Sequence, residues 1–451
     1  MHLVFLSTLY EPPWGGSENL WSGAAMCALE QGHRVSVFVS EREKLETPLE
    51  RLKAAGAKLY FWKPKYLPLN FLQRIVKKLS GRKLPQWEWW HRNIPQDADA
   101  ICVSQGGVFC ALKFHGLAES VESSNRPYVL LARCDTGIDF FNEETRPRMK
   151  EFFEKAAAYV AASQSTIDQV RLYLPSKLQN ARVLHSPLAD YGAESGEGLT
   201  TEDTESTEDR FVQKHGSAWA SQAGASESDS LASKLADSPV SESLTLSAIG
   251  PASLPATSYS LPDTAPEALM ACVGRLRVSD KGQHLLLAAL AEEPWRSRPY
   301  RLSFYGEGPD RKYLEELVEF YGLGEKIHFA GHTKDVGEIW RRSHLAVQPS
   351  FVEGAPQSLL EAMLCRRPCV ATAVSGIPEW VEEGKTGFLA EAPTMHHLRL
   401  ALERAWESRN RWQEMGEAAR EACLAKRDPD PEGTLLGLLR KAAEREGKLN
   451  A

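Results

Sequence analysis

Residues 349–363 read PSFVEGAPQSLLEAM and carry the clearest structural signal in the chain. A strand is predicted to end at Pro349, and a loop with Glu353 and Gly354 follows it. A helix is predicted to begin near Pro356, because proline suits the first turn of a helix. Ordinary strand–loop–helix units need neither the glycine nor carboxylates on the loop side, so we expect this loop to bind a ligand.

The predicted helix offers groups that fit a phosphate and a sugar. The backbone N–H groups of Ser358 and Leu359 would be unpaired at the helix N-terminus, which is an arrangement that binds anions. Glu361 lies one turn further along, and its carboxylate can accept two hydrogen bonds from a vicinal diol such as a ribose.

Strands and helices alternate on both sides of this block, which predicts parallel α/β sheets. In the C-terminal half, strands are expected at 269–274, 301–305, 326–330, 344–348, 368–372 and 387–390, and helices at 281–292, 310–321, 335–342, 357–365 and 377–383. After residue 393 the pattern is helical, with a break at 428–431. In the N-terminal half, a helix through residue 31 opens at 15–18, and strands are expected at 3–7, 34–39, 58–62, 100–104, 128–132, 159–162 and 182–185.

Residues 191–265 differ in composition from the rest of the chain. They contain 15 serines, 12 acidic residues and 3 basic residues, and they show no apolar period. Such a composition is typical of disorder. We therefore predict two Rossmann-like, doubly wound domains at 1–190 and 266–427, a disordered linker between them at 191–265, and a helical tail at 428–451.

The composition also excludes several classes of protein. Hydrophobic residues make up 43% and charged residues 25% of the 451 residues, as in ordinary globular proteins. Outside 191–265 the net charge is only +2, which argues against nucleic-acid binding. No run approaches the roughly eighteen apolar residues of a membrane-spanning helix. The only close cysteine pair, Cys365 and Cys369, has no second pair at ligand spacing, so we predict reduced thiols and no zinc site.

In 349–363, seven residues separate Glu353 from Glu361. This E-x7-E pattern resembles the signature of retaining glycosyltransferases with the GT-B fold, and specifically glycosyltransferase family 4, the "glycosyl transferases group 1" domain. Five further blocks resemble the same family in the same order: 273–276 with 281–282, 305–309, 329–331, 375–379 and 384–389.

The resemblance implies a fold, an activity and a set of site residues. The fold would be GT-B, with two domains facing a cleft, and the donor would be a UDP- or GDP-linked sugar that serves as substrate, with no cofactor. The C-terminal domain would bind the donor diphosphate through Arg275 and Lys281, the nucleotide ribose through Glu361, and the transferred sugar through Glu353 with the backbone that follows it. The donor-contacting set would be Gly16, Gly274, Arg275, Lys281, Gly354, Ala355, Ser358, Leu359 and Glu361.

The chemistry of sugar transfer agrees with these roles. When the bond between C1 and the diphosphate breaks, negative charge grows on the leaving group, and two fixed cations would stabilise it. Arg275 follows a predicted strand and Lys281 opens the next helix, so both can reach one phosphate. This pair removes the need for a bound metal ion.

The N-terminal half is predicted to complete the site. Gly15 and Gly16 lie between a buried strand and a helix start, where backbone can approach a phosphate closely. They also resemble the N-terminal glycine loop of the family. Many members place a histidine after a later strand, whereas this chain has Cys134 and Asp135 there. Asp135 is a candidate for orienting the acceptor hydroxyl, with a turn or helix-capping role as the alternative.

Residues 63–92 hold eight Lys or Arg residues and one Glu, with apolar residues at helical spacing and tryptophans at 87, 89 and 90. Such a helix can lie on an anionic membrane, and relatives that act on lipid-linked acceptors often use one. The alternative is an ordinary amphipathic helix packed on its own sheet. We expect a cytoplasmic protein with peripheral contact at the inner face of the membrane.

The sequence therefore predicts a metal-independent, retaining glycosyltransferase that acts on a glycan or lipid-linked acceptor. Two alternatives stay open. One is a nucleotide-sugar-binding scaffold without transfer activity, suggested by the missing histidine. The other is a nucleotide-sugar epimerase, which shares the GT-B architecture but is not expected to carry the E-x7-E block.

Overall fold

The computed structural model describes residues 1–9, 16–41, 47–62, 85–106, 109–112, 114, 116–132, 145–188, 267–333 and 335–449. The acidic, serine-rich segment at 191–265 and Asp135 lie outside these ranges, so the linker and that candidate residue stay predictions.

The described part of the first 188 residues forms one sheet of seven parallel strands, in the order β3-β2-β1-β4-β5-β6-β7. The strands are β1 (His2–Ser7), β2 (Arg34–Ser40), β3 (Lys58–Trp62), β4 (Ala100–Gln105), β5 (Tyr128–Ala132), β6 (Ala158–Ala161) and β7 (Ala181–Val183). Every residue of the central strands β1, β4 and β5 is buried, as expected for a sheet covered on both faces.

Each face of this sheet has its own apolar core, because side chains alternate along a strand. On one face, Val4 and Leu6 of β1 pack with side chains from α4 (Pro85–Asn93), α5 (Leu117–Ser123), α6 (Arg146–Lys155) and α7 (Gln164–Tyr173). On the other face, Leu3 and Phe5 pack with α1 (Gly16–Glu30) and α2 (Thr47–Ala54). A short 3₁₀ turn, η2, spans Cys110–Leu112.

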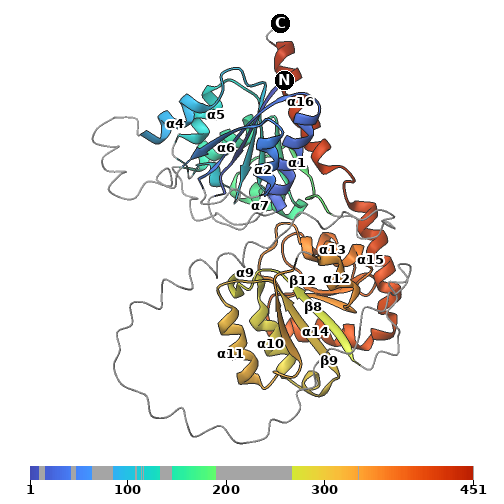
Figure 1. Ribbon diagram of the computed structural model, residues 1–451. Helices are drawn as coiled ribbons and strands as arrows, with labels where there is room; N and C mark the ends of the chain where they lie inside the picture. The colour runs from blue at the N-terminus through green and yellow to red at the C-terminus, as the bar shows by residue number, and fades with distance from the viewer. Residues whose placement is uncertain are drawn as a thin grey trace, which may run out of the picture. The chain divides into compact units, whose positions relative to one another are not determined.

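The C-terminal half forms a second parallel sheet, with six strands within the described residues, in the order β10-β9-β8-β11-β12-β13. The strands are β8 (Ala268–Val273), β9 (Tyr300–Tyr305), β10 (Ile327–Gly331), β11 (Leu345–Gln348), β12 (Cys369–Thr372) and β13 (Gly387–Ala390). The helices are α9 (Val278–Lys281), α10 (Gln283–Ala291), α11 (Arg311–Tyr321), α12 (Val336–Arg341), α13 (Gln357–Leu364), α14 (Met395–Glu407) and α15 (Trp412–Lys426), with 3₁₀ turns η4 (Trp295–Ser297), η5 (Ile377–Glu379) and η6 (Arg409–Arg411). Side chains of α10, α11 and α14 share one core with the sheet, and those of α12 and α13 share another. Figure 1 shows these helices around the strands of the sheet.

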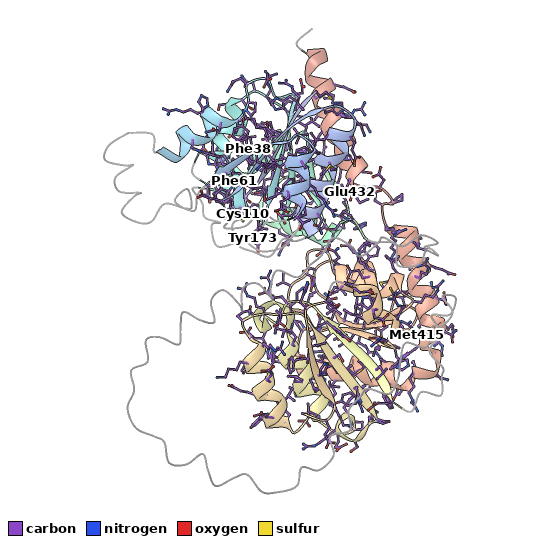
Figure 2. The ribbon with its side chains drawn as sticks, in the orientation of Figure 1. Phe38, Phe61, Cys110, Tyr173, Met415 and Glu432 are labelled. Atoms are coloured by element: carbon purple, nitrogen blue, oxygen red, sulfur yellow. The ribbon has the colours of Figure 1, made fainter. Side chains whose placement is uncertain are left out.

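The last helix, α16 (Pro431–Leu449), packs on the first sheet although it follows the second in the chain. Leu435, Leu436 and Leu439 are buried in the same core as Leu3 and Phe5. In Figure 2 the labelled Glu432 lies where α16 meets α1, and a Cβ added to Gly23 of α1 would lie 2.5 Å from Glu432 Cγ. The close contact explains a glycine inside α1.

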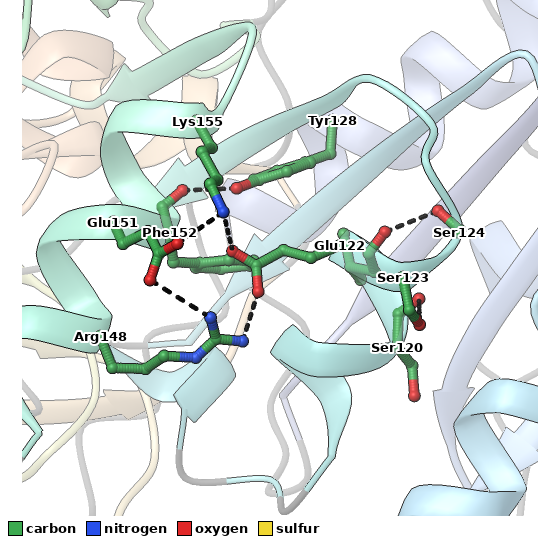
Figure 3. A network of polar contacts seen from close by, with 10 residues as sticks. Ser120, Glu122, Ser123, Ser124, Tyr128, Arg148, Glu151, Phe152 and Lys155 are labelled. Atoms are coloured by element: carbon green, nitrogen blue, oxygen red, sulfur yellow. Dashed lines mark hydrogen bonds and ion pairs between the residues drawn. The ribbon is translucent and has the colours of Figure 1, made fainter.

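Charged side chains tie α5 to α6 where the strand β5 begins (Figure 3). Glu122 pairs with Arg148, and Lys155 lies 4.0 Å from Glu122 and 2.6 Å from Glu151. Beside them, the Tyr128 hydroxyl donates to the carbonyl of Phe152 at 2.7 Å. These contacts lie at the amino ends of the strands, so we assign them to stability and not to ligand binding.

The predicted fold class is confirmed, and the predicted strands are found to within two residues at either end. The helix expected at 377–383 is wrong, because only the short turn η5 forms there. Gly384 has a φ of +72° and the N–H of Glu382 donates to Thr386 Oγ1 at 2.8 Å, so the chain turns towards β13 instead of continuing as a helix. Trp90 is buried and Trp89 packs against the first core, which favours the structural alternative for the tryptophans at the end of the basic segment. Residues 63–84 lie outside the described ranges.

Candidate functional site

The C-terminal residues predicted to bind a donor lie in the segments that follow the two strands at the switch point of the second sheet. The strand order reverses between β8 and β11, which are neighbours in the sheet but belong to different halves of its winding. Loops after two such strands diverge and leave a crevice at the carboxyl edge, which is where α/β sheets bind ligands. Arg275 and Lys281 follow β8, while Glu353 and Glu361 follow β11.

The loop after β8 is fixed against the loop after β11 by backbone contacts. The carbonyl of Asp280 accepts a hydrogen bond from the N–H of Phe351 at 2.8 Å. Gly282 has a φ of +63°, and a Cβ placed there would lie 2.1 Å from the carbonyl oxygen of Pro349. Only glycine fits this close approach. Gly282 of the motif therefore fixes the backbone position of its neighbour Lys281.

Two glycines of the loop after β9 hold the other side of the same segment. A Cβ on Gly306 would lie 2.2 Å from the carbonyl oxygen of Gly274, and one on Gly308 would lie 2.3 Å from that of Leu276. The predicted block at 305–309 therefore supports the loop that carries Arg275.

Glu353 is the most constrained side chain of the site. Its carboxylate is almost fully buried and forms an ion pair with Lys281. The same oxygen, Oε1, accepts hydrogen bonds from Gln348 Nε2 at 2.6 Å and from Ser350 Oγ at 2.7 Å. The Glu353 N–H donates to Ser375 Oγ at 3.3 Å. Buried carboxylates need this many donors to remain charged in an apolar environment.

Arg275 differs from Lys281 in having no acidic partner. Its side chain is exposed, and in the described ranges no carboxylate lies within ion-pair distance of its guanidinium. Its carbonyl is held by Gln283 Nε2 at 2.8 Å. The backbone is therefore fixed while the cation remains available to an anion.

The Glu361 carboxylate and the first amides of α13 also lack hydrogen-bond partners among the described residues. In the part of the chain that the structure describes, no donor contacts the Glu361 carboxylate, and the amides of Ser358 and Leu359 donate to no acceptor. Burial raises the pKa of Glu361 to about 7. A mostly buried carboxylate and two free amides are suited to accept hydroxyl groups and an anion respectively.

At the first sheet, Gly16 is the first residue of α1, directly beyond the loop that follows β1. β1 and β4 flank the switch point of that sheet. The sequence did not single out Glu18, which is buried in the first turn of α1 and accepts a hydrogen bond from Ser7 Oγ at 3.3 Å. Its place two residues after the glycine pair was the available signal.

The other candidates have simpler outcomes. Gly15, Cys134 and Asp135 lie outside the described residues, so the acceptor side stays a prediction. Cys365 and Cys369 are free and buried, as predicted for reduced thiols. Among the described helices, none has the length and hydropathy needed to cross a bilayer.

Sequence reasoning missed the roles of Gln348 and Ser350. Gln348 precedes the recognised motif, at the end of a buried strand, where a glutamine is unusual because buried polar groups need partners. That polar residue in an apolar run was the signal that could have found it.

Comparisons with known proteins agree with this geometry. Residues 261–422 match the family model "Glycosyl transferases group 1". The chain is 32% identical over 122 residues to N-acetyl-alpha-D-glucosaminyl L-malate synthase of Bacillus anthracis, covering 27% of this chain and 32% of that protein. It is 32% identical over 127 residues to the lipopolysaccharide glucosyltransferase WaaG of Escherichia coli, covering 28% of this chain and 34% of WaaG. The matched segments thus span only about a third of these relatives.

Solved structures are similar over nearly the whole chain. HepE of Anabaena, solved in complex with UDP, superposes with a TM-score of 0.60 at 17% identity and covers 99% of this chain and 100% of its own. The structure of WaaG superposes with a TM-score of 0.56 at 16% identity, covering 97% and 99%. At such identities the likeness shows the fold. Residues 261–422 thus match the family model for glycosyl transferases group 1, and the two parallel α/β domains have the GT-B fold.

Proposed function

We propose that this protein is a retaining glycosyltransferase that moves a sugar from a UDP- or GDP-linked donor to a glycan or lipid-linked acceptor. The observation that carries the proposal is the grouping at one sheet edge of three features: a constrained Lys281–Glu353 pair, Arg275, and the carboxylate of Glu361. Among the described residues, Arg275 has no acidic partner and Glu361 has no donor. The family and the named activities of its relatives support it.

In the proposed reaction, Arg275 and Lys281 bind the donor diphosphate, and the amides of Ser358 and Leu359 contribute hydrogen bonds. The bond between sugar C1 and the diphosphate oxygen breaks, and its electron pair stays with the leaving phosphate. The acceptor oxygen forms a bond to C1 on the same face, and its proton passes to that phosphate. The two cations stabilise the charge that develops.

Glu353 is assigned to the sugar and Glu361 to the ribose, so the two do not act as a glycosidase pair. Because two protein cations face the diphosphate, the proposal includes transfer without a bound metal ion. Asp135 remains the proposed acceptor-orienting residue.

The experiment is a panel of nucleotide sugars, with released nucleoside diphosphate as the signal and with UDP and GDP binding measured by calorimetry. We expect turnover of one donor and a kcat that is strongly reduced but still measurable in Glu353→Gln, whereas Lys312→Ala, an exposed change on α11, retains the full kcat. Tight nucleotide binding without release or transfer would instead support the scaffold, and interconversion of sugars without transfer would support the epimerase.

We also propose peripheral contact with the cytoplasmic face of a membrane through the basic segment. Replacing Lys77, Lys78, Arg82 and Lys83 by Gln would weaken the free energy of binding to anionic vesicles by about 1 kcal/mol per charge, and co-sedimentation with the vesicles measures this binding. Absence of sedimentation by the unchanged protein at low salt would refute this contact.

A further inference from the structure

Glu353 is held from one side only. Three donors, Lys281 Nζ, Gln348 Nε2 and Ser350 Oγ, all contact its Oε1. The other oxygen, Oε2, has no donor within the described residues, and it is not among the buried polar atoms that lack a partner. Oε2 therefore retains contact with solvent while Oε1 is enclosed.

Gln348 is itself oriented. Its side chain is 6% exposed, and its Oε1 accepts a hydrogen bond from Ser358 Oγ at 3.3 Å while its Nε2 donates to Glu353. Because a carboxylate oxygen can only accept, the amide group must face Glu353 with its nitrogen. The carboxylate thus fixes which way the amide points, and the Ser358 hydroxyl on the first turn of α13 donates to the amide oxygen on the other side.

Ser350 is fixed as firmly. It is fully buried, and Thr372 Oγ1 of the neighbouring strand β12 donates to its carbonyl at 2.5 Å. The strands β11 and β12 and the helix α13 therefore all contribute to the position of one carboxylate.

We propose that Gln348 and Ser350 are positioning residues for Glu353: they bind Oε1 so that Oε2 is presented to the sugar of the donor. This inference rests on the proposed function and extends it to two residues outside the E-x7-E pair. Neither residue needs to touch the substrate. Each acts by holding an acceptor oxygen in place before the donor arrives, which lowers the reorganisation that accompanies transfer.

The test compares Gln348→Met and Ser350→Ala with the unchanged protein. Met keeps the length of Gln and removes the donor, and Ser350→Ala provides a second route if Gln348→Met fails to fold. Ser343→Ala is the matched control, because Ser343 is also a buried serine of this domain but donates to the Ile339 carbonyl at 2.8 Å. The measured quantities are UDP affinity, the kcat for the nucleotide sugar that the panel identifies, and the melting temperature.

We expect kcat to fall on the order of 10- to 100-fold in both variants, with the Kd for UDP changed less than about twofold, because UDP has no sugar for Glu353 to contact. Ser343→Ala should retain its kcat. In a Glu353→Gln background, Gln348→Met should cause no further loss, since a positioning residue acts through its target.

A full additional loss in the Glu353→Gln background, or an unchanged kcat in both single variants, would overturn the positioning role while leaving the proposed function intact. An unchanged protein that binds no nucleoside diphosphate and turns over no donor would overturn both. A drop in UDP affinity equal to the drop in kcat would also contradict the inference, since it would indicate general damage to the site.

Discussion

At the scale of single residues, the two carboxylates of the E-x7-E pair have opposite environments. Glu353 is surrounded by donors, whereas Glu361 is desolvated and has none among the described residues. The two cations also differ in their partners: Lys281 pairs with Glu353, whereas Arg275 has no acidic partner among the described residues. We therefore expect the two carboxylates to respond differently to substitution, and likewise the two cations.

Lys281→Ala should lower kcat by about a hundredfold or more, because one preorganised cation near the leaving phosphate is lost. The measurement is nucleoside diphosphate release at saturating donor. Lys312→Ala, which removes an exposed lysine, is the control. Loss of turnover on adding a chelator, with recovery on adding manganese, would contradict the metal-free reaction.

Glu361→Gln should stabilise the ligand-free protein at pH 8 but not at pH 4. Burial raises the pKa of Glu361 from 4.5 to about 7, so the folded protein holds this proton more tightly than the unfolded chain does. The resulting stability is present below about pH 4.5 and is lost as the pH rises to about 7. At pH 8 the free energy of unfolding of Glu361→Gln should exceed that of the unchanged protein by on the order of 1–3 kcal/mol.

Urea unfolding of both proteins across this pH range measures the effect. Glu319→Gln, an exposed change on α11, should show no pH-dependent difference. A constant difference between Glu361→Gln and the unchanged protein at all pH values would refute the desolvation of Glu361.

At the scale of elements, the loops after β8 and β11 act as one unit because Gly282 lets them touch. Gly282→Ala should lower the free energy of unfolding by about 2 kcal/mol or more, since φ is +63° and the new Cβ would lie 2.1 Å from the Pro349 carbonyl oxygen. It should also lower kcat by moving Lys281. Gly324→Ala is the control, because a Cβ there meets nothing within 4 Å. Equal unfolding free energies for the two variants would show that the loops are not tied here.

At the scale of the whole molecule, the two ends of the chain share one core. Leu439→Ala should cost about 2–5 kcal/mol, because Leu439 of α16 is fully buried against the first sheet. Leu172→Ala, at a leucine that is 85% exposed, should change stability by less than about 0.5 kcal/mol. Chemical unfolding measures both, and a silent Leu439→Ala would mean that α16 is a detachable tail.

The acidic segment gives a second prediction at this scale, from composition alone. Replacing residues 195–260 by a Gly-Ser linker should leave kcat/KM within about tenfold, or ~1.4 kcal/mol, because loop-closure entropy grows only slowly with length. A larger loss would show that the segment contributes to the site.

Local pattern was enough for much of this protein. The alternation of strand and helix patterns predicted both parallel sheets. A strand buried on both faces is apolar throughout and a helix has one apolar stripe, so a few residues are enough to tell them apart. Ordered motifs placed Lys281, Glu353 and Glu361 at the carboxyl edge of the second sheet, because the loop after each strand is itself a local feature. The short turn η5 was mistaken for a helix, because the turn at Gly384 and the contact of Glu382 with Thr386 end the segment, and the apolar period does not show either.

Contacts between distant segments could not be predicted in this way. The pairing of Lys281 with Glu353, the contact of Gly282 with Pro349 and the packing of α16 on β1 join residues far apart in the chain. The pKa of Glu361 likewise depends on burial by neighbouring elements and not on its own sequence position. Gln348 shows the difference most directly: its sequence marks a polar residue in a buried strand, but only the folded site supplies the carboxylate that makes it useful.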